Sequence, residues 1–318
     1  MNDIRVAVIG VGYLGKFHAQ KYAAMDGVQL IGVADIDAAR AGEVAAEVNT
    51  RAYADYRELL DSVDAVSIVV PTESHYTVGI ECLKHAKDVL IEKPMTSTLD
   101  QADALIDLAE SGGRILQIGH LERFNPAVLA LKDIVEHPMF IESHRLSIFK
   151  DRCTDVSVVL DLMIHDIDII MNVVKADLVG IHAAGVPVIC KHADIANVRL
   201  QFANGCVANV TASRISTKNQ RKIRLFQKDA YISVDFVGRE IVIIRRSQNP
   251  GQGLVPGMDI RQMSFRDADV LEDELAAFIQ AVRSRRPPLV TGRTGRQALA
   301  VATQIMDEID AAIRRYLP

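Results

Sequence analysis

Short apolar runs alternate with amphipathic segments over the first 120 residues of the chain. Runs that are apolar throughout are typical of strands buried on both faces, and amphipathic segments between them are typical of helices that cover a sheet. The alternation therefore predicts an α/β unit built on a parallel sheet. Strands are expected at 5–10, 29–34, 65–70, 88–91 and 115–118, and helices at 16–25, 38–47, 56–61, 76–85 and 99–110.

The pattern changes near Pro126, where strand-like runs begin to follow one another with short turns between them. This predicts an α+β unit with a largely antiparallel, open sheet, and Asn204-Gly205 predicts a hairpin with a type I′ turn. We therefore expect two domains, at 1–122 and 123–318. In the second, strands are expected at 140–148, 178–186, 197–202, 206–212, 222–227, 231–235 and 240–245, and helices at 126–135, 156–174, 269–285 and 294–316.

The first strand runs directly into a glycine-rich turn, Gly10-Val11-Gly12-Tyr13-Leu14-Gly15. In such a turn Gly10 permits the tight bend, Gly12 lets the backbone approach a pyrophosphate, and Gly15 lets the next helix pack close to the sheet. The helix N-terminus then faces the phosphate charge. The turn predicts a dinucleotide-binding Rossmann domain at 1–122, with a structural turn or a ligand such as S-adenosylmethionine as the alternatives.

The second strand ends at Asp35, about 20 residues beyond the last glycine, where an acid binds the adenosine ribose. A carboxylate accepts hydrogen bonds from both ribose hydroxyls and repels a 2′-phosphate. Asp35 is followed by Ile36 rather than by an arginine, and Arg40 is expected on the following helix. These residues favour NAD over NADP.

The composition is that of an ordinary globular protein, with 49% hydrophobic residues, 24% charged residues and a net charge of −5. The negative charge gives no support to nucleic-acid binding. Four cysteines lack a regular spacing, and Cys190 with His192 is too little for a metal site, so we expect reduced thiols and no metal. The chain starts in a core strand and has no apolar run of membrane-spanning length, so we expect no membrane partner and a cytoplasmic location.

Lys93 follows an apolar strand directly and precedes Pro94. Ligands of an open α/β sheet bind beyond the carboxyl ends of its strands, and partial desolvation there lowers the pKa of a lysine toward the range useful for proton transfer. A surface lysine at a strand end is the alternative.

Asp161 and His165 stand four residues apart in a predicted helix, on one face, and Asp168 shares much of that face. A carboxylate beside an imidazole can orient it and stabilise its charged form, as an acid/base group requires. An ordinary surface pair is the alternative. A dinucleotide, a lysine and a histidine are together what the oxidation of a secondary alcohol needs.

At these residues the chain resembles the Gfo/Idh/MocA family of oxidoreductases, over essentially its whole length. The similarity rests on the glycine turn, Asp35, His75 with Glu92-Lys93-Pro94, the run from Arg123 to Ala127, and Asp161 with His165. The resemblance implies that Lys93 is catalytic, that His165 is an acid/base or substrate-hydroxyl partner, and that Asp161 contacts substrate. It also implies that Pro71, Thr72, His75, Glu92 and Arg123 line the cofactor cleft.

The runs 119–127 and 161–168 look most like the nucleotide-sugar branch of that family, which oxidises the 3-hydroxyl of UDP-N-acetylglucosamine or its uronic acid ahead of transamination for lipopolysaccharide sugars. Asn125 is a further substrate candidate. A diphosphate needs cations, and Lys150 and Arg152 stand just before the catalytic helix, with Arg145 and Arg214 as weaker candidates. Solvated surface charges are the alternative.

Two other functions stay open. One keeps the hydride chemistry but uses an inositol or a free sugar, and the other is a non-catalytic, NAD-sensing regulatory protein. The presence of Lys93, Asp161 and His165 together argues against the second. The family resemblance also implies that the open sheet face is covered by another copy, giving a homodimer or a homotetramer.

Overall fold

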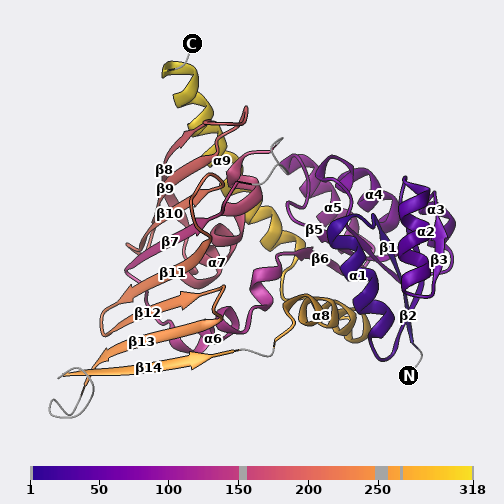
Figure 1. The fold of residues 1–318 in the computed structure, drawn as a ribbon, viewed down its shortest axis with the longest axis horizontal. Coiled ribbons are helices and arrows are strands. Elements are labelled where there is room, and N and C mark those ends of the chain that lie inside the picture. Colours follow the sequence, from indigo (N-terminus) through magenta and orange to yellow (C-terminus); the bar gives the residue numbers. More distant parts are fainter. Residues whose placement is uncertain (1–2, 150–155, 248–256, 266–267, 317–318) are drawn as a thin grey trace. The chain divides into compact units, whose positions relative to one another are not determined.

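A computed structural model describes residues 3–149, 156–247, 257–265 and 268–316 (Figure 1). Contacts divide the chain into two units. The first runs to Phe124 and also takes in Asp269–Gln297, and the second holds Asn125–Ala268 and the chain from Ala298 onward. The predicted domains, 1–122 and 123–318, differ from these units mainly in one respect. Residues 269–297 were assigned to the second domain, whereas in the structure they belong to the first unit.

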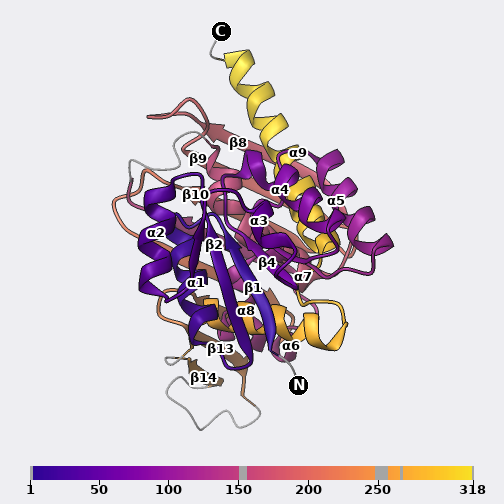
Figure 2. The same ribbon diagram turned by 90° about the vertical axis from the view of Figure 1, so that its right-hand side faces the viewer.

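The first unit is built on a six-stranded sheet in the order β3-β2-β1-β4-β5-β6, and every neighbouring pair is parallel. This is the doubly wound order with its switch point between β1 and β4, and β1 and β2 lie side by side in Figure 2. Its elements are β1 Ile4–Ile9, α1 Tyr13–Ala24, β2 Val28–Ala34, α2 Ala38–Glu47, β3 Arg51–Tyr53, α3 Arg57–Leu60, β4 Ala65–Ile68, α4 Thr72–Lys84, β5 Asp88–Glu92, α5 Leu99–Ser111, β6 Leu116–Gly119, the 3₁₀ turn η1 Leu121–Phe124 and α8 Val270–Ser284.

Helix α8 joins the first unit because its apolar face completes that unit's core. Leu275 and Phe278 of α8 are fully buried in one cluster with Val6 and Val8 of β1 and Tyr22 of α1. Burying side chains of this size contributes about 1.5–3 kcal/mol each. The core of the six-stranded sheet is therefore completed by a helix that begins about 150 residues after the sheet's last strand, β6.

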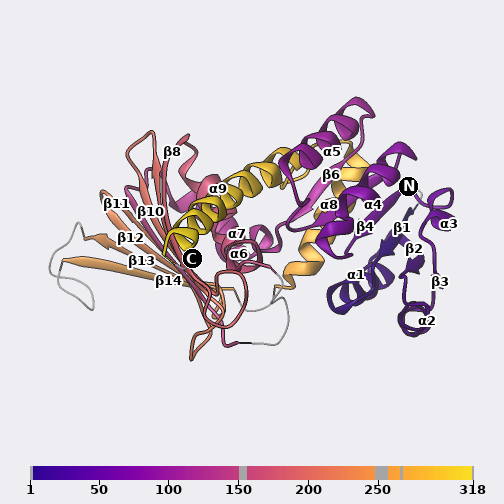
Figure 3. The ribbon, with the colours of Figure 1, turned by 90° about the horizontal axis from the view of Figure 1, so that it is seen from above.

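The second unit is built on an eight-stranded sheet in the order β14-β13-β12-β11-β7-β10-β9-β8. Only the β7–β10 pair is parallel, so the predicted largely antiparallel sheet is confirmed. Helices α6 and α7 lie on one face of it (Figure 3). Its elements are α6 Pro126–Ile134, β7 Phe140–Leu146, the π turn η2 Val159–Met163, α7 Ile164–Val174, β8 Leu178–Val186, β9 Ile195–Phe202, β10 Val207–Ser213, β11 Gln220–Gln227, β12 Ala230–Asp235, β13 Glu240–Arg246, β14 Met258–Ser264 and α9 Gly292–Tyr316, whose first six residues belong to the first unit.

The hairpin predicted at Asn204-Gly205 is confirmed, but its turn type was wrong. A type I′ turn needs positive φ at both central residues, and here only Gly205 has it, at +86°. Gly205 N donates to Phe202 O at 2.9 Å, and Cys206 N donates to the Asn204 side chain. The connection is thus a tight turn closed by a left-handed glycine.

Candidate cofactor and catalytic site

A pocket of about 500 Å³ lies in the first unit, beyond the carboxyl ends of β1, β2 and β4. This is the switch point of the sheet, where ligands of doubly wound folds bind. Of the residues predicted to hold the cofactor, the pocket is lined by Gly10, Gly12, Asp35, Ile36 and Pro71. The glycine turn and the ribose acid, 20 residues apart in the sequence, are therefore brought together.

The three glycines of the turn are required for three different reasons. Gly10 has φ +86°, and a Cβ there would lie 2.6 Å from Val69 O. A Cβ on Gly15 would lie 1.9 Å from Gly10 O, so only glycine lets α1 pass this close to the turn. A Cβ on Gly12 would meet nothing nearer than the Arg40 guanidinium at 3.8 Å, so Gly12 faces open space. That space fits a pyrophosphate, because the N-terminus of α1 has no side-chain cap there and presents the positive end of the helix dipole.

Asp35 is held in place by the backbone around the pocket. Its Oδ2 accepts the N–H of Val11 at 2.8 Å, and its Oδ1 accepts the N–H of Asp37 at 3.0 Å. The carboxylate is thereby fixed between the glycine turn and the start of α2, and each oxygen keeps lone pairs for ribose hydroxyls. Ile36, beside it, is 99% exposed and supplies an apolar surface rather than a cation at this position.

Arg40 lies on α2, as expected, but its side chain also reaches the pocket, which was not predicted from the sequence. Its guanidinium sits 3.9 Å from Asp37 and near Gly12, where a pyrophosphate would lie. Tyr56 and Ser74 also line the pocket and were not predicted. The sequence contained one signal for this position of Arg40. Arg40 stands three residues after Asp37, which caps α2, so the two side chains lie on the same side of the helix, next to the pocket.

Three other predicted cofactor residues are near the pocket in sequence but do not line it. Tyr13 is 75% exposed and stacks edge-on against Phe17, with the ring centroids 5.4 Å apart. Leu14 is half-buried in the first turn of α1, and Thr72 is half-buried at the first position of α4. Contacts of these three with a cofactor stay predictions.

His75 is buried and joins two strand ends. Its Nδ1 lies 2.8 Å from Pro94 O and its Nε2 lies 2.9 Å from Val70 O, so the ring ties the end of β4 to the turn that holds Lys93. Burial lowers the pKa of His75, against the raising effect of the two carbonyls. A neutral ring donates to one of these carbonyls only. The structure thus gives His75 a role in holding the Lys93-Pro94 turn.

Lys93 follows the last residue of β5 and is half-buried, and the Lys93–Pro94 peptide is cis. Its N–H donates to Oε2 of Glu92 at 3.3 Å, and Oε1 of Glu92 lies 3.3 Å from His18 Nε2 of α1. Glu92 is buried. The lysine therefore stands at the carboxyl edge of the parallel sheet, as predicted, on a backbone fixed by the side chains of Glu92 and His75.

Arg123 and Asn125 follow β6, at the end of the first unit and the start of the second. Arg123 is buried in η1. Asn125 is buried and caps α6, since its side chain accepts the N–H of Ala127 at 3.0 Å. The predicted contacts of Arg123 with the cofactor and of Asn125 with substrate stay predictions.

Asp161 and His165 are both half-buried in the second unit, where the chain passes from the π turn η2 into α7. A π turn is rare and occurs frequently at functional sites. Asp168, predicted to share their face, is instead buried at 2% exposure. Asp161 and His165 are therefore partly accessible to solvent, whereas Asp168 belongs to the core of the second unit.

The two weaker diphosphate candidates are core residues. Arg145 donates to Asp166 of α7 through Nε at 2.8 Å and Nη2 at 3.1 Å, and both side chains are buried. Arg214 is buried beside Asp194 and donates to Val156 O at 2.6 Å. Both guanidiniums are buried and paired within the second unit, so the alternative of solvated surface charges does not hold for them, and their contact with a diphosphate stays a prediction.

Lys150 and Arg152, the stronger diphosphate candidates, lie outside the described residues. Within the part of the chain that is described, no three His, Cys, Asp or Glu side chains are grouped as metal ligands. The helices described there include none with the length and hydropathy needed to cross a membrane.

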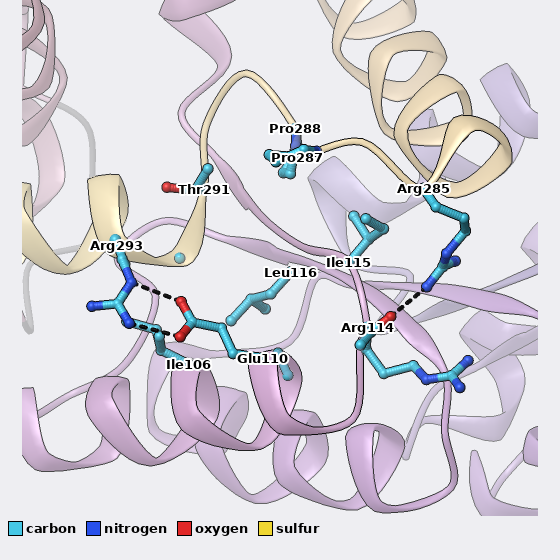
Figure 4. A pocket seen from close by; sticks show the side chains of 13 residues that line it. Ile106, Glu110, Arg114, Ile115, Leu116, Arg285, Pro287, Pro288, Thr291 and Arg293 are labelled. Carbon is cyan, nitrogen blue, oxygen red and sulfur yellow. Dashed lines mark hydrogen bonds and ion pairs between the residues drawn. The ribbon is translucent and has the colours of Figure 1, made fainter.

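A second pocket, of about 350 Å³, lies in the first unit between the end of α5 and the segment 285–293 (Figure 4). The arginine side chains that line this pocket form hydrogen bonds or ion pairs with other groups of the protein. Arg293 forms a two-point ion pair with Glu110 at 2.6–2.7 Å, and Arg285 donates to Gly113 O at 2.6 Å. None of the residues predicted for cofactor or catalysis lines this pocket.

Comparison with known proteins agrees with the geometry of the first pocket. Residues 4–120 match the oxidoreductase family with an NAD-binding Rossmann fold, GFO_IDH_MocA, and residues 136–233 match the GFO/IDH/MocA C-terminal domain. The chain is similar to UDP-N-acetylglucosamine 3-dehydrogenase of Acidithiobacillus ferrooxidans, with 40% identity over 99% of this chain and all of that protein. A solved structure of that enzyme has a TM-score of 0.93 and covers 98% of this chain and 99% of its own.

The chain is also similar to myo-inositol 2-dehydrogenase of Thermotoga maritima, at 28% identity over 93% of each protein. The matches to both domains of one family, and the relative that spans the chain end to end, agree with the pocket at the glycine turn and with the half-buried lysine beyond β5. The chain therefore belongs to the Gfo/Idh/MocA family of oxidoreductases and carries that family's NAD-binding Rossmann domain.

Proposed function

We propose that this protein oxidises the 3-hydroxyl of a nucleotide sugar of the UDP-N-acetylglucosamine type, with NAD as the hydride acceptor. The observation that carries the proposal is the 40% identity with UDP-N-acetylglucosamine 3-dehydrogenase over essentially the whole of both chains. Identity of this extent includes the second unit, which supplies the substrate residues in this proposal. The pocket beside Asp35 supports NAD as the cofactor.

The cofactor is held by charge and by close backbone approach. Gly12 and the N-terminus of α1 receive the pyrophosphate, Arg40 adds a cation beside it, and Asp35 binds the ribose hydroxyls. When bound, NAD supplies the acceptor for the hydride. The fixed carboxylate at the ribose favours NAD over NADP, because it would repel a 2′-phosphate.

The proton is handled by the protein's own side chains. Lys93 takes the proton of the sugar hydroxyl, as a half-buried general base. His165, oriented by Asp161, binds the reacting hydroxyl and stabilises the charge that develops there. Asn125, Lys150 and Arg152 are proposed to bind the rest of the nucleotide sugar, the two cations at its diphosphate.

Initial rates of NADH formation test this proposal. The panel contains UDP-N-acetylglucosamine, its uronic acid, myo-inositol and glucose, each with NAD. We expect the highest kcat/KM with one of the two nucleotide sugars. The highest value with myo-inositol would instead favour the second candidate, which the similarity to myo-inositol 2-dehydrogenase supports. Tight NAD binding without turnover on any sugar would favour a regulatory protein.

We further propose a homodimer or homotetramer formed through the open face of the eight-stranded sheet. Helices cover the other face, while the open face carries the half-buried aromatic cluster of Phe140, Phe226 and Tyr231, with centroids 5.2–5.6 Å apart. Aromatic side chains are enriched in protein interfaces. Light scattering should give at least twice the chain mass at micromolar concentration, and a monomer would contradict this. A cytoplasmic place in lipopolysaccharide sugar synthesis fits the proposed product.

A further inference from the structure

A group of titratable side chains is buried beneath the strand end that carries Lys93, within the first unit. Glu92 of β5 faces His18 of α1 at 3.3 Å, and Glu274 of α8 is fully buried. None of the three is exposed by more than 8%. Neither His18 nor Glu274 belongs to a motif predicted from the sequence, and the proposed chemistry does not use them.

The two carboxyl groups have different surroundings. Oε2 of Glu92 accepts the backbone N–H of Lys93 at 3.3 Å, and Oε1 faces His18. Both side-chain oxygens of Glu274 are buried, and no group among the described residues donates a hydrogen bond to them, although the Gln117 side chain donates to the Glu274 main-chain carbonyl at 3.2 Å. A buried carboxylate without a partner is far more costly than a buried neutral acid. Glu92 is therefore the one suited to carry a negative charge, and Glu274 the one suited to stay neutral.

Other charged groups around Glu274 do not change this assignment. From α1, Tyr22 has its hydroxyl on Ser67 at 2.9 Å and is itself buried. From the β6–η1 segment, which packs on α8, come His120, Glu122 and Arg123, each with contacts of its own. No ion pair with Glu274 occurs among the described residues. Burial, followed by the charge of Glu92, raises the pKa of Glu274 well above its ordinary value.

We propose that Glu274 is a positioning residue, a buried neutral acid that keeps Glu92 as the single negative charge beside His18 and beneath Lys93. Glu92 has little room to move away, because a Cβ on Gly119 would lie only 2.7–2.9 Å from its carboxyl atoms. A second charge on Glu274 would repel Glu92 from this place. Glu92 would then lose the Lys93 N–H, and Lys93 would lose the support that fixes its backbone.

The catalytic part of this inference rests on the proposed function, whereas the protonation of Glu274 does not. Infrared spectroscopy of the wild-type protein at neutral pH should show the carbonyl stretch of a buried protonated acid. The band should vanish in Glu274→Gln and persist in Asp273→Asn, which removes an exposed carboxylate from the same helix. Absence of the band from the wild-type protein, or its persistence in Glu274→Gln, would overturn the proposal even if no sugar is turned over.

The pH profile of kcat with UDP-N-acetylglucosamine distinguishes positioning from a merely structural role. Glutamine is neutral and of the same shape, so Glu274→Gln should match the wild-type kcat at neutral pH. One pH unit above the Glu274 pKa only about one-tenth of the wild-type protein keeps the neutral acid, so its kcat should fall about tenfold while that of Glu274→Gln does not. KM for NAD should be equal in both. Superimposable alkaline limbs, or a neutral-pH kcat lost in Glu274→Gln, would overturn the positioning role.

Discussion

The two glycines on either side of the first turn of α1 respond oppositely to the same substitution. Gly15→Ala puts a Cβ 1.9 Å from Gly10 O. Gly10 cannot give way, because its N–H donates to Ala34 O at 2.7 Å and Val69 lies directly behind it. Overpacking against backbone costs about 3 kcal/mol. For a unit of this size that lowers Tm by roughly 6–12 °C, at about 2–4 °C per kcal/mol.

Gly12→Ala meets no such obstacle, since its Cβ would have open space and Gly12 has φ −63°. Loss of glycine's freedom in the unfolded chain should leave stability equal or higher by about 0.4–1 kcal/mol. The same methyl occupies the place of the pyrophosphate, and we expect NAD affinity to fall at least about tenfold, or 1.4 kcal/mol.

Thermal unfolding without ligand and calorimetry with NAD separate the two effects. Gly12→Ala should keep its Tm and lose NAD affinity, whereas Gly15→Ala should lose Tm. If Gly12→Ala binds NAD as the wild-type protein does, the pyrophosphate does not lie over Gly12. A normal Tm in Gly15→Ala would refute the packing argument.

Three further outcomes follow from named contacts. NAD should raise Tm more than NADP at equal concentration, and Asp35→Ser with Ile36→Arg should narrow the difference; stronger stabilisation by NADP in the wild type would contradict this. Arg40→Ala should weaken NAD binding severalfold in calorimetry and leave Tm unchanged, whereas the exposed control Arg51→Ala should keep the wild-type NAD affinity. Equal NAD affinities in the two variants would show that Arg40 does not contact the cofactor. Asp194 is buried, but hydrogen bonds from Cys190 and the backbone of 188–190 outweigh burial and lower its pKa from 3.8 to about 2. The ionised carboxylate therefore contributes about 2 kcal/mol to the free energy of unfolding above pH 4, and this contribution is lost as the pH falls toward 2. Acid unfolding of Asp194→Asn should lack this loss, and an equal pH dependence of stability in Asp194→Asn and the wild-type protein would be the contrary result.

Much of the first unit follows from local sequence pattern. Buried parallel strands are short and apolar throughout, so β1, β2, β4, β5 and β6 were all predicted, and the glycine turn has its meaning from the strand before it and the helix after it. Two of the edge strands, β3 and β14, lack that signal. β3 has three residues and β14 is mostly exposed and polar, so neither was predicted.

Contacts between distant parts of the chain were out of reach of the sequence. Nothing in the pattern of α8 says which sheet it covers, and that contact is what buries Glu274. One local signal was present, because Glu274 shares the helix face of Phe278, four residues on, and lies next to Leu275. Likewise the burial of Arg145 depends on Asp166, 21 residues away, which spacing alone does not reveal.

The half-buried lysine beyond β5 is proposed to perform the proton transfer of a sugar dehydrogenase. The decisive variant is Lys93→Met, measured by steady-state NADH formation from UDP-N-acetylglucosamine and by calorimetry with NAD, with the exposed Lys84→Met as the control. General acid–base groups contribute about 10²–10⁴-fold, so kcat should fall by that factor while NAD affinity stays near that of the wild-type protein. Near-normal turnover in Lys93→Met would contradict the claim, and loss of NAD binding with it would make Lys93 a residue that holds the cofactor.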